Sequence, residues 1–304
     1  MLRVENLTRK FQDKVAVNDI SFSVKPGVIT GLLGPNGAGK TTTMRLLTGY
    51  LEPSAGSILY NGKSFLEDTI SVQKKLGYLP ESAPLYQDML ISEYLNYMAD
   101  IRGVKEEDKE ARIQKMIEVC ELSSHLHTPI SFLSKGFKQR VALAGTLIHD
   151  PEIIILDEPT SGLDPNQISH IRTLIRGLGK EKTLILSTHI LQEVEDICDE
   201  VIIINNGKIV ANSSVKNLHS GHTVSILVNA DLSKVKSIFT EKPFLSVEEY
   251  SEINEGDFKG YLVHMEELKP ELAFSTLAKS SLQVRELKTF KRSLESIFEE
   301  LTRK

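Results

Sequence analysis

The 304-residue chain is predicted to form an α/β fold, a doubly wound parallel sheet followed by a small α+β domain. From residue 152 to residue 205, apolar runs of strand length alternate with stretches of helical periodicity. This alternation is typical of parallel strands covered by helices on both faces. The sequence turns polar and glycine-bearing at residues 213–222, which indicates a boundary. We therefore expect one domain over residues 1–218 and an accessory domain over residues 219–304.

The composition is that of a folded globular protein, with 40% hydrophobic and 25% charged residues. A net charge of −5 shows none of the basic excess that marks nucleic-acid binders, so no nucleic acid is expected as a partner. Cys120 and Cys198 lie at apolar positions and outside any CxxC pattern, which predicts buried reduced thiols. The N-terminus lacks the apolar segment of a signal peptide, and no apolar run approaches the ~20 residues of a spanning helix. If the protein works at a membrane, another chain must span it.

The first third of the chain is β-rich. Strands are expected at LRVENL, VAVNDISFSV and, after the Pro26–Gly27 turn, VITGLL. A helix is expected from Gly39 to about Leu47, followed by strands at SILYNG and LGYLP. Residues 82–150 then change character and predict a helical subdomain with three helices, at ISEYLNYMADIR, EEDKEARIQKMIEVC and FKQRVALAGTLIH.

The alternating region and the accessory domain complete the prediction. The strands EIIIL, TLILST and VIIIN are separated by helices at about 165–178 and at ILQEVEDIC, and the hairpin VIIINNGKIV closes the unit. The accessory domain is predicted to follow a βαββαβ order and to end in a helix. One face of that helix carries an apolar stripe, which fits either core packing or a docking surface: Leu294, Ile297, Phe298 and Leu301.

The segment GPNGAGKTT at 34–42 matches G-x-x-x-x-G-K-[ST] between a strand and a helix. Its glycines let the backbone N–H groups turn inward as an anion nest at a helix N-terminus. Lys40 is expected to reach the β- and γ-phosphates, Thr41 to ligate Mg²⁺ and Thr42 to contact a phosphate. The full predicted loop comprises Gly34, Pro35, Asn36, Gly37, Ala38, Gly39, Lys40, Thr41 and Thr42.

Asp157 and Glu158 follow the buried strand EIIIL. Because neighbouring residues on a strand point to opposite sides, Asp157 can hold Mg²⁺ while Glu158 faces the γ-phosphate as general base. The alternative is two carboxylates capping a strand end in a solvated loop. His189 ends another strand, at TLILSTH. Alone it would be a structural histidine, but beside a triphosphate site its imidazole can hydrogen-bond the γ-phosphate.

A second candidate anion-binding site lies in LSKGFKQR at 133–140. Ser134 is a good N-cap for the following helix and Gly136 is small, so the helix N-terminus can receive an anion. The SGLDP segment at 161–165 predicts another helix start, with Asp164 as N-cap and Pro165 in the first turn.

Taken together and in this order, GPNGAGKT, LSKGFKQR, ILDEPTSGLD and STH resemble the ATP-binding subunits of ABC transporters over about residues 1–215. The resemblance implies a P-loop NTPase cassette of the ABC type that hydrolyses ATP with Mg²⁺. It also implies a head-to-tail homodimer, in which Ser134 and Gly136 meet the γ-phosphate held by the other subunit's loop. Asp164 would lie near that interface. By the same resemblance Phe11 stacks on adenine, although alone it would be interpreted as a core residue.

The sequence departs from the family pattern at two places. LSKGF replaces the usual LSGGQ, so that Lys135 adds positive charge and the glutamine, Gln139, comes two places later. Glu81 stands where the family has a glutamine that ligates Mg²⁺. Glu81 is therefore either a third metal ligand beside Thr41 and Asp157, or an exposed loop carboxylate.

The segments GYLPE, LSKGFKQR and SLESIFEELT are similar to the exporter-side branch, which includes gliding-motility-type and multidrug efflux ATPases. This implies an ATPase that energises export by a separate transmembrane permease and sits on the cytoplasmic face of the cell membrane. Residues 82–100, with Leu85, Tyr86, Met89 and Leu90, would begin the docking region for that permease. Two alternatives are a soluble ABC ATPase acting on a macromolecular complex and a regulatory nucleotide binder without turnover.

Overall fold

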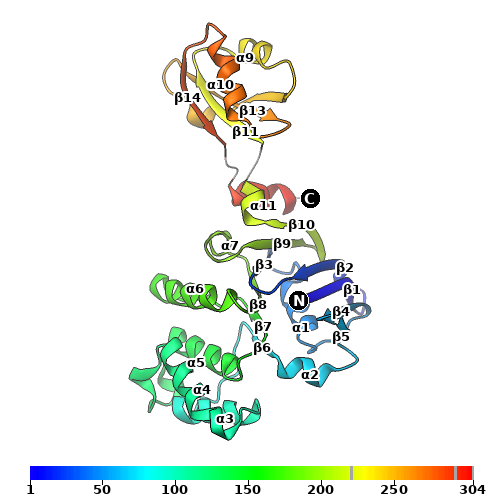
Figure 1. The fold of residues 1–304 in the computed structure, drawn as a ribbon, viewed down its shortest axis with the longest axis vertical. Helices are drawn as coiled ribbons and strands as arrows, with labels where there is room; N and C mark the ends of the chain where they lie inside the picture. Colours follow the sequence, from blue (N-terminus) through cyan, green and yellow to red (C-terminus); the bar gives the residue numbers. More distant parts are fainter. Residues whose placement is uncertain (220–221, 291–292, 303–304) are drawn as a thin grey trace. The chain divides into compact units, whose positions relative to one another are not determined.

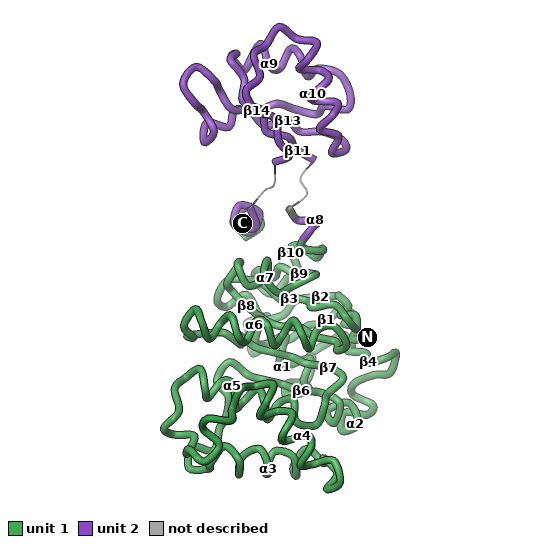
Figure 2. Tube along the Cα trace, turned by 60° about the vertical axis from the view of Figure 1, so that its left-hand side comes forward, with its two compact units in different colours: residues 1–215, 301–304 green, residues 216–300 purple. Residues whose placement is uncertain are grey.

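The computed structural model describes the chain except residues 220–221, 291–292 and 303–304. The described residues form two compact units, which Figure 2 distinguishes by colour: residues 1–215 with 301–304, and residues 216–300. Each unit has its own hydrophobic cluster.

The first unit begins with an antiparallel sheet of strand order β2-β1-β4-β5. Its strands are β1 (Leu2–Phe11), β2 (Lys14–Val24), β4 (Ala55–Tyr60) and β5 (Lys63–Ser64). Alternate side chains of β1 and β2 are buried, among them Val4, Leu7 and Ile20, so one face of this sheet is a core face.

The central sheet has the order β10-β9-β3-β8-β7-β6. Strands β6 to β9 and β3 are parallel, and β10 is antiparallel to β9. The strands are β3 (Ile29–Leu33), β6 (Leu76–Leu79), β7 (Ile153–Asp157), β8 (Thr183–Thr188), β9 (Glu200–Asn205) and β10 (Lys208–Ser214). Every residue of β3, β7 and β8 is buried, which explains the apolar runs within these strands.

Helices cover this sheet, as Figure 1 shows for α1 (Lys40–Leu47), α6 (Pro165–Gly179) and α7 (Leu191–Ile197). Met44 and Leu47 of α1 join Ile155 and Ile185 of the sheet in one cluster with the first sheet. The predicted doubly wound α/β fold is confirmed. The prediction missed the short helices α2 (Thr69–Lys74) and α8 (Val215–His219), which have too few turns to show a clear apolar period.

The helical region contains α3 (Ile91–Ile101), α4 (Glu106–Val119) and α5 (Lys135–Leu147), with the short turns η1 (Ser123–His125) and η2 (Ile130–Phe132) between α4 and α5. Each of the three helices predicted here is present. Cys120 follows α4 and Cys198 follows α7, and both are buried free cysteines, as expected. Burial raises the pKa of the Cys120 thiol to about 12. In the part of the chain that the structure describes, no helix combines the length and apolar character needed to cross a membrane.

The second unit is built on an antiparallel sheet of order β12-β13-β11-β14 with two helices. Its elements are β11 (Thr223–Val228), α9 (Leu232–Ile238), β12 (Phe244–Glu249), η3 (Ser251–Ile253), β13 (Lys259–Met265), α10 (Pro270–Ala278) and β14 (Val284–Thr289), followed by α11 (Leu294–Thr302). The βαββαβ order is the predicted one. Leu294 and Ile297 of α11 are buried, which favours core packing over a docking surface for these two residues.

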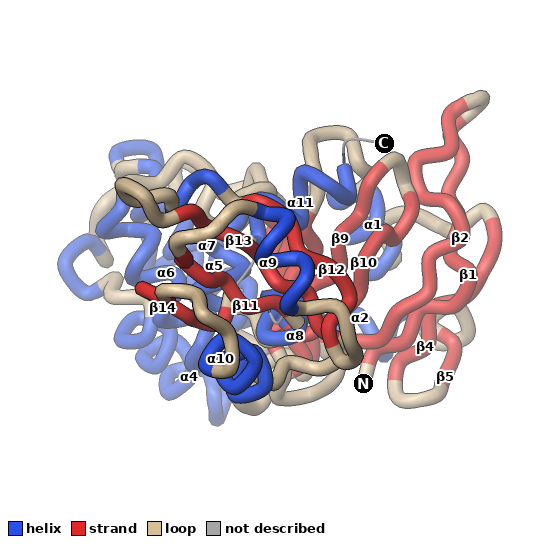
Figure 3. Tube along the Cα trace, turned by 90° about the horizontal axis from the view of Figure 1, so that it is seen from above, coloured by secondary structure: helices blue, strands red, loops and turns tan. Residues whose placement is uncertain are grey.

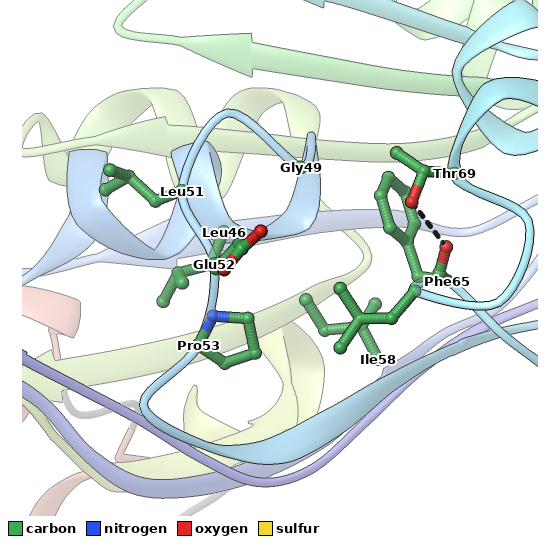
Figure 4. Close-up of a pocket in the computed structure, with 9 residues that line it drawn as sticks. Leu46, Gly49, Leu51, Glu52, Pro53, Ile58, Phe65 and Thr69 are labelled. Carbon is green, nitrogen blue, oxygen red and sulfur yellow. Dashed lines mark hydrogen bonds between the residues drawn. The ribbon is translucent and has the colours of Figure 1, made fainter.

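A small cavity of about 70 Å³ lies beside α1, walled by Leu46, Ile58 and Phe65, whose side chains are drawn in Figure 4. Thr69 closes one side and donates a hydrogen bond to the carbonyl oxygen of Phe65, 3.1 Å away. A side chain on Gly49 would not fit, because its Cβ would lie 2.5 Å from the Phe65 ring. The lining includes none of the predicted site residues, so the cavity is a packing feature of the core.

Candidate functional site

The loop at residues 34–39 joins β3 to α1, and α1 begins at Lys40. Its conformation requires glycine at position 39, where φ is 109° and an added Cβ would lie 2.5 Å from the carbonyl oxygen of Ala16. Gly37 likewise has φ of 81°. This curled backbone ends at a helix N-terminus, where free N–H groups attract an anion. The predicted phosphate loop therefore has the expected strand, turn and helix around it.

Lys40 is buried, with 6% of its surface exposed. Its ammonium donates to the carbonyl oxygens of Gly34 at 2.8 Å and Pro35 at 3.3 Å, and lies 3.5 Å from Oε1 of Glu158. A buried cation needs such partners, since an unpaired charge in the interior is costly. The contacts hold the ammonium at the loop that would receive phosphates.

Asp157 ends β7 with only 1% of its surface exposed. Its Oδ1 accepts a hydrogen bond from Ser187 and lies 3.4 Å from Oγ1 of Thr41. Its Oδ2 is buried without a hydrogen-bond partner among the described residues. An unsatisfied carboxylate oxygen beside a hydroxyl fits the oxygen donors that Mg²⁺ prefers.

Glu158 follows directly with φ of 50°, an uncommon backbone conformation for a side chain of this kind. Its N–H donates to Oγ of Ser187 at 3.1 Å, which anchors it to β8. Its Oε2 lies 2.7 Å from Nδ1 of His189. Because β7 and β8 are neighbouring parallel strands, Glu158 and His189 leave the same edge of the sheet together. The structure thus brings together Lys40, Thr41, Asp157, Glu158 and His189.

Ser134, Gly136 and Asp164 form a second group. No hydrogen bond or ion pair among the described residues joins them to the phosphate loop or to Glu158. Ser134 caps α5 by accepting from Phe137 N at 3.3 Å, and Asp164 caps α6 by accepting from Gln167 N at 2.9 Å. Both capping predictions are confirmed.

The two helix starts of this group are packed together. The end of the Gln167 side chain occupies the space where a Cβ on Gly136 would lie, so the two helix starts are in close contact. Lys135 covers Gly162 in the same way, with its Nζ 2.0 Å from where a Cβ would lie. Gln139 donates to the carbonyl oxygen of Pro159 at 2.9 Å, next to Glu158. The displaced glutamine therefore supports the loop that follows β7 in the same chain.

Phe11 and Glu81 lie apart from these contacts. Phe11 is 40% exposed, and the Arg9 guanidinium lies 4.6 Å from its ring centre, so the core interpretation is wrong. Glu81 is exposed after β6, and no hydrogen bond or ion pair among the described residues links it to Thr41 or Asp157. Its assignment as a metal ligand stays a prediction.

Ser187, Thr160 and Glu193 also shape this site, although sequence analysis did not select them. Ser187 binds both Asp157 and the backbone of Glu158. Glu193 is 1% exposed and accepts hydrogen bonds from Thr160 and Thr188. The sequence feature that could have indicated Glu193 is its position in α7, where it lies on the buried face with Val194 and Ile197.

A groove of about 640 Å³ opens between the helical region and the central sheet. It is lined by aromatic and apolar side chains that include Tyr50, Tyr86, Met98 and Ile101. Burial also raises the pKa of Tyr78, in the same lining, to about 12. Of the four residues predicted to begin a docking region, Leu85 and Tyr86 line this groove, whereas Met89 and Leu90 do not.

The phosphate loop, the buried carboxylates and the histidine at the carboxyl edge of a parallel sheet define a P-loop nucleotide hydrolase. The model of the family described as ABC transporter matches residues 17–161. The chain is 39% identical over 253 residues to an uncharacterized ABC transporter ATP-binding protein of Methanocaldococcus jannaschii, covering 83% of this chain and 92% of the relative. The Nod factor export ATP-binding protein I of Ralstonia nicotianae is 35% identical, over 72% of this chain and 68% of its own length.

Among solved structures, one titled as the ATP-binding subunit of an ABC transporter aligns with a TM-score of 0.66 and 30% identity. It covers 72% of this chain and 92% of the solved chain. The chain therefore belongs to the family of ABC transporter ATP-binding subunits, and it is an ATPase.

Proposed function

We propose that this ATPase works as a head-to-tail homodimer that energises export by a separate transmembrane permease, at the cytoplasmic face of the membrane. The proposal depends on two predicted phosphate-binding segments, the loop at residues 34–42 and the start of α5 at Ser134. In the part of the chain that the structure describes, no hydrogen bond joins these two segments. Lys40, Asp157, Glu158 and His189 converge at one sheet edge, whereas Ser134 caps α5 and, among the described residues, forms no hydrogen bond with them. A second subunit that offers its own α5 to this edge would complete the site.

Within one subunit, the loop N–H groups and Thr42 would bind the phosphates, and Lys40 would exchange carbonyl oxygens for phosphate oxygens. Thr41 and Asp157 would hold Mg²⁺, with Glu81 as a candidate third ligand. The metal supplies positive charge that neutralises the phosphates. Glu158 takes the proton of the attacking water, and His189 supports Glu158 and reaches the γ-phosphate. Exposed Phe11 is available for stacking on adenine.

Across the dimer, Ser134, Gly136 and the α5 N-terminus of one subunit would bind the γ-phosphate held by the other. Asp164 lies on the adjoining helix start, within reach of the same interface. ATP would stabilise the dimer because it binds both subunits, and hydrolysis would release them. Binding of two ATP molecules would thus form the contact between the two subunits, and their hydrolysis would open it.

The groove beside Tyr86 and Ile101 is the proposed permease contact. Ile101 is 57% exposed and Tyr86 is 50% exposed, so a largely apolar surface is open there. The Ralstonia relative is named as an export ATP-binding protein, and this similarity supports an export role for the present chain.

The test is to purify the tagged full-length chain from detergent-solubilised membranes and identify the proteins that accompany it. We expect a polypeptide with several spanning helices. Ile101→Asp should abolish its recovery, because a charge in the groove opposes apolar docking. Ile70→Asp is the matched control, since Ile70 is 71% exposed and does not line the groove. Recovery of the chain alone, or with ribosomes or DNA, would overturn the permease proposal and favour a soluble ABC ATPase.

A further inference from the structure

A buried carboxylate, that of Glu193, lies beside the two chain segments that carry Glu158 and His189. The proposed contacts with ATP do not involve it. Glu193 is 1% exposed in α7, and no ion pair joins it to a cation within the described part of the chain. A buried carboxylate without a cation is costly, and an apolar side chain of similar size would usually pack there at less cost. Its hydrogen bonds therefore indicate its role.

The two oxygens of Glu193 bind two different loops. Oε1 accepts from the hydroxyl of Thr160, two residues after Glu158. Oε2 accepts from the hydroxyl of Thr188 at 2.6 Å, directly before His189. Glu158 and His189 meet on the other side at 2.7 Å. The contacts close a ring in which Glu193 ties together the two chain segments that carry these side chains.

The ring matters most for His189. The imidazole side chain is 47% exposed, so packing alone does little to fix its orientation. Its backbone is held instead, because Oγ1 of Thr188 also accepts from the N–H of Ile190 at 3.0 Å. Thr188 thus bridges the residue after His189 and the carboxylate of Glu193. Loss of Glu193 would free this bridge.

We propose that Glu193 is a positioning residue that sets the His189 imidazole against the Glu158 carboxylate. The inference rests on the catalytic roles proposed for these two side chains. Small displacements of a catalytic group can cost about a hundredfold in rate. Glu193 would therefore affect the rate of hydrolysis and leave ATP binding, which uses the loop and Lys40, nearly unchanged.

The experiment measures phosphate release by the purified full-length chain. Glu193→Leu should lower kcat at least about tenfold with KM for ATP changed less than about threefold. Glu193→Gln keeps the shape and one acceptor oxygen, so it should restore most of the rate. Thr188→Val replaces the hydroxyl with a methyl group of similar size and should reproduce the loss if Glu193→Leu fails to fold. Gln192→Leu is the control, because Gln192 is exposed on the same helix and bonds Asp196.

Two outcomes separate this inference from the proposed function. In a His189→Ala background, Glu193→Leu should cost less than about twofold, because its effect passes through His189. Full additivity, or normal kcat in both Glu193→Leu and Thr188→Val, would overturn the positioning role. Normal hydrolysis by His189→Ala and Glu158→Gln would instead overturn the catalytic assignments themselves.

Discussion

The two units of this chain bury different kinds of side chain. In the first unit, Lys40, Asp157, Glu158 and Glu193 are the buried acidic and basic residues of the whole described chain. Among the described residues of the second unit, the buried polar side chains are the neutral Thr223 and Ser225. Its charges pair at the surface, as in Lys242 with Glu266.

This contrast distinguishes a unit with buried charged side chains from a unit whose core is held together by apolar packing. Exposed ion pairs contribute little to stability, at most about 1 kcal/mol each. The core of the second unit is an apolar cluster that includes Val224, Tyr261 and Val263. Burying a charge costs stability, so the buried Lys40, Asp157 and Glu158 at one sheet edge, with Glu193 of α7 behind them, indicate a site where charged groups have a role.

The largest effect is expected for Glu158→Gln. Without the carboxylate base, ATP hydrolysis should fall by about 10² to 10⁴, while Lys40 and the loop still bind ATP. Phosphate release measures the rate, and gel filtration with ATP should show a trapped dimer. Glu110→Gln is the control, because Glu110 is exposed on α4. Monomers alone in the presence of ATP would contradict the trans contact assigned to Ser134.

The fold class and the candidate site residues that lie in short motifs were accessible from sequence for local reasons. The phosphate loop, the Asp157–Glu158 pair and the caps Ser134 and Asp164 each depend on a few adjacent residues. The contact between Glu158 and His189 then follows from parallel pairing of β7 and β8.

What escaped prediction depends on contacts between distant segments. Glu193 meets Thr160 only because α7 packs beside the loop after β7, and the sequence shows just an acidic residue in a short helix. The hydrogen bond from Gln139 to Pro159 is another such case. The helix α2 was missed because it buries only Val72.

A middle-sized effect is expected in the second unit. Val263→Ala, at a fully buried position of β13, should lower the free energy of unfolding of that unit by about 2 kcal/mol, through a cavity. Urea unfolding measures the loss. Leu245→Ala is the control, since Leu245 is 63% exposed. ATP hydrolysis should stay unchanged while the unit remains folded. A parallel loss of activity would show that the catalytic edge depends on the second unit.

The last effect depends on pH and concerns His149, a half-buried titratable group outside the site. Its Nε2 lies 3.2 Å from the carbonyl oxygen of Leu76, and its Nδ1 is buried without a hydrogen-bond partner among the described residues. Burial, together with the nearby Arg102 cation, lowers the pKa of His149 from 6.5 to about 4. The neutral imidazole is thus the form that the folded protein accommodates.

The sign of the pH dependence follows from this lowered pKa. Between pH 6.5 and 4 the unfolded chain binds a proton at His149 that the folded chain rejects, so stability falls as the pH falls through this range. At about 1.4 kcal/mol per pKa unit, the loss has a ceiling of about 3 kcal/mol. His149→Gln keeps a donor for Leu76 and removes the titration. The difference in unfolding free energy between wild type and variant, from urea titrations, should be constant above pH 7 and shift toward the variant below pH 6.5. A difference independent of pH would show that His149 is accommodated in its charged form, and buried charge would then extend beyond the catalytic edge.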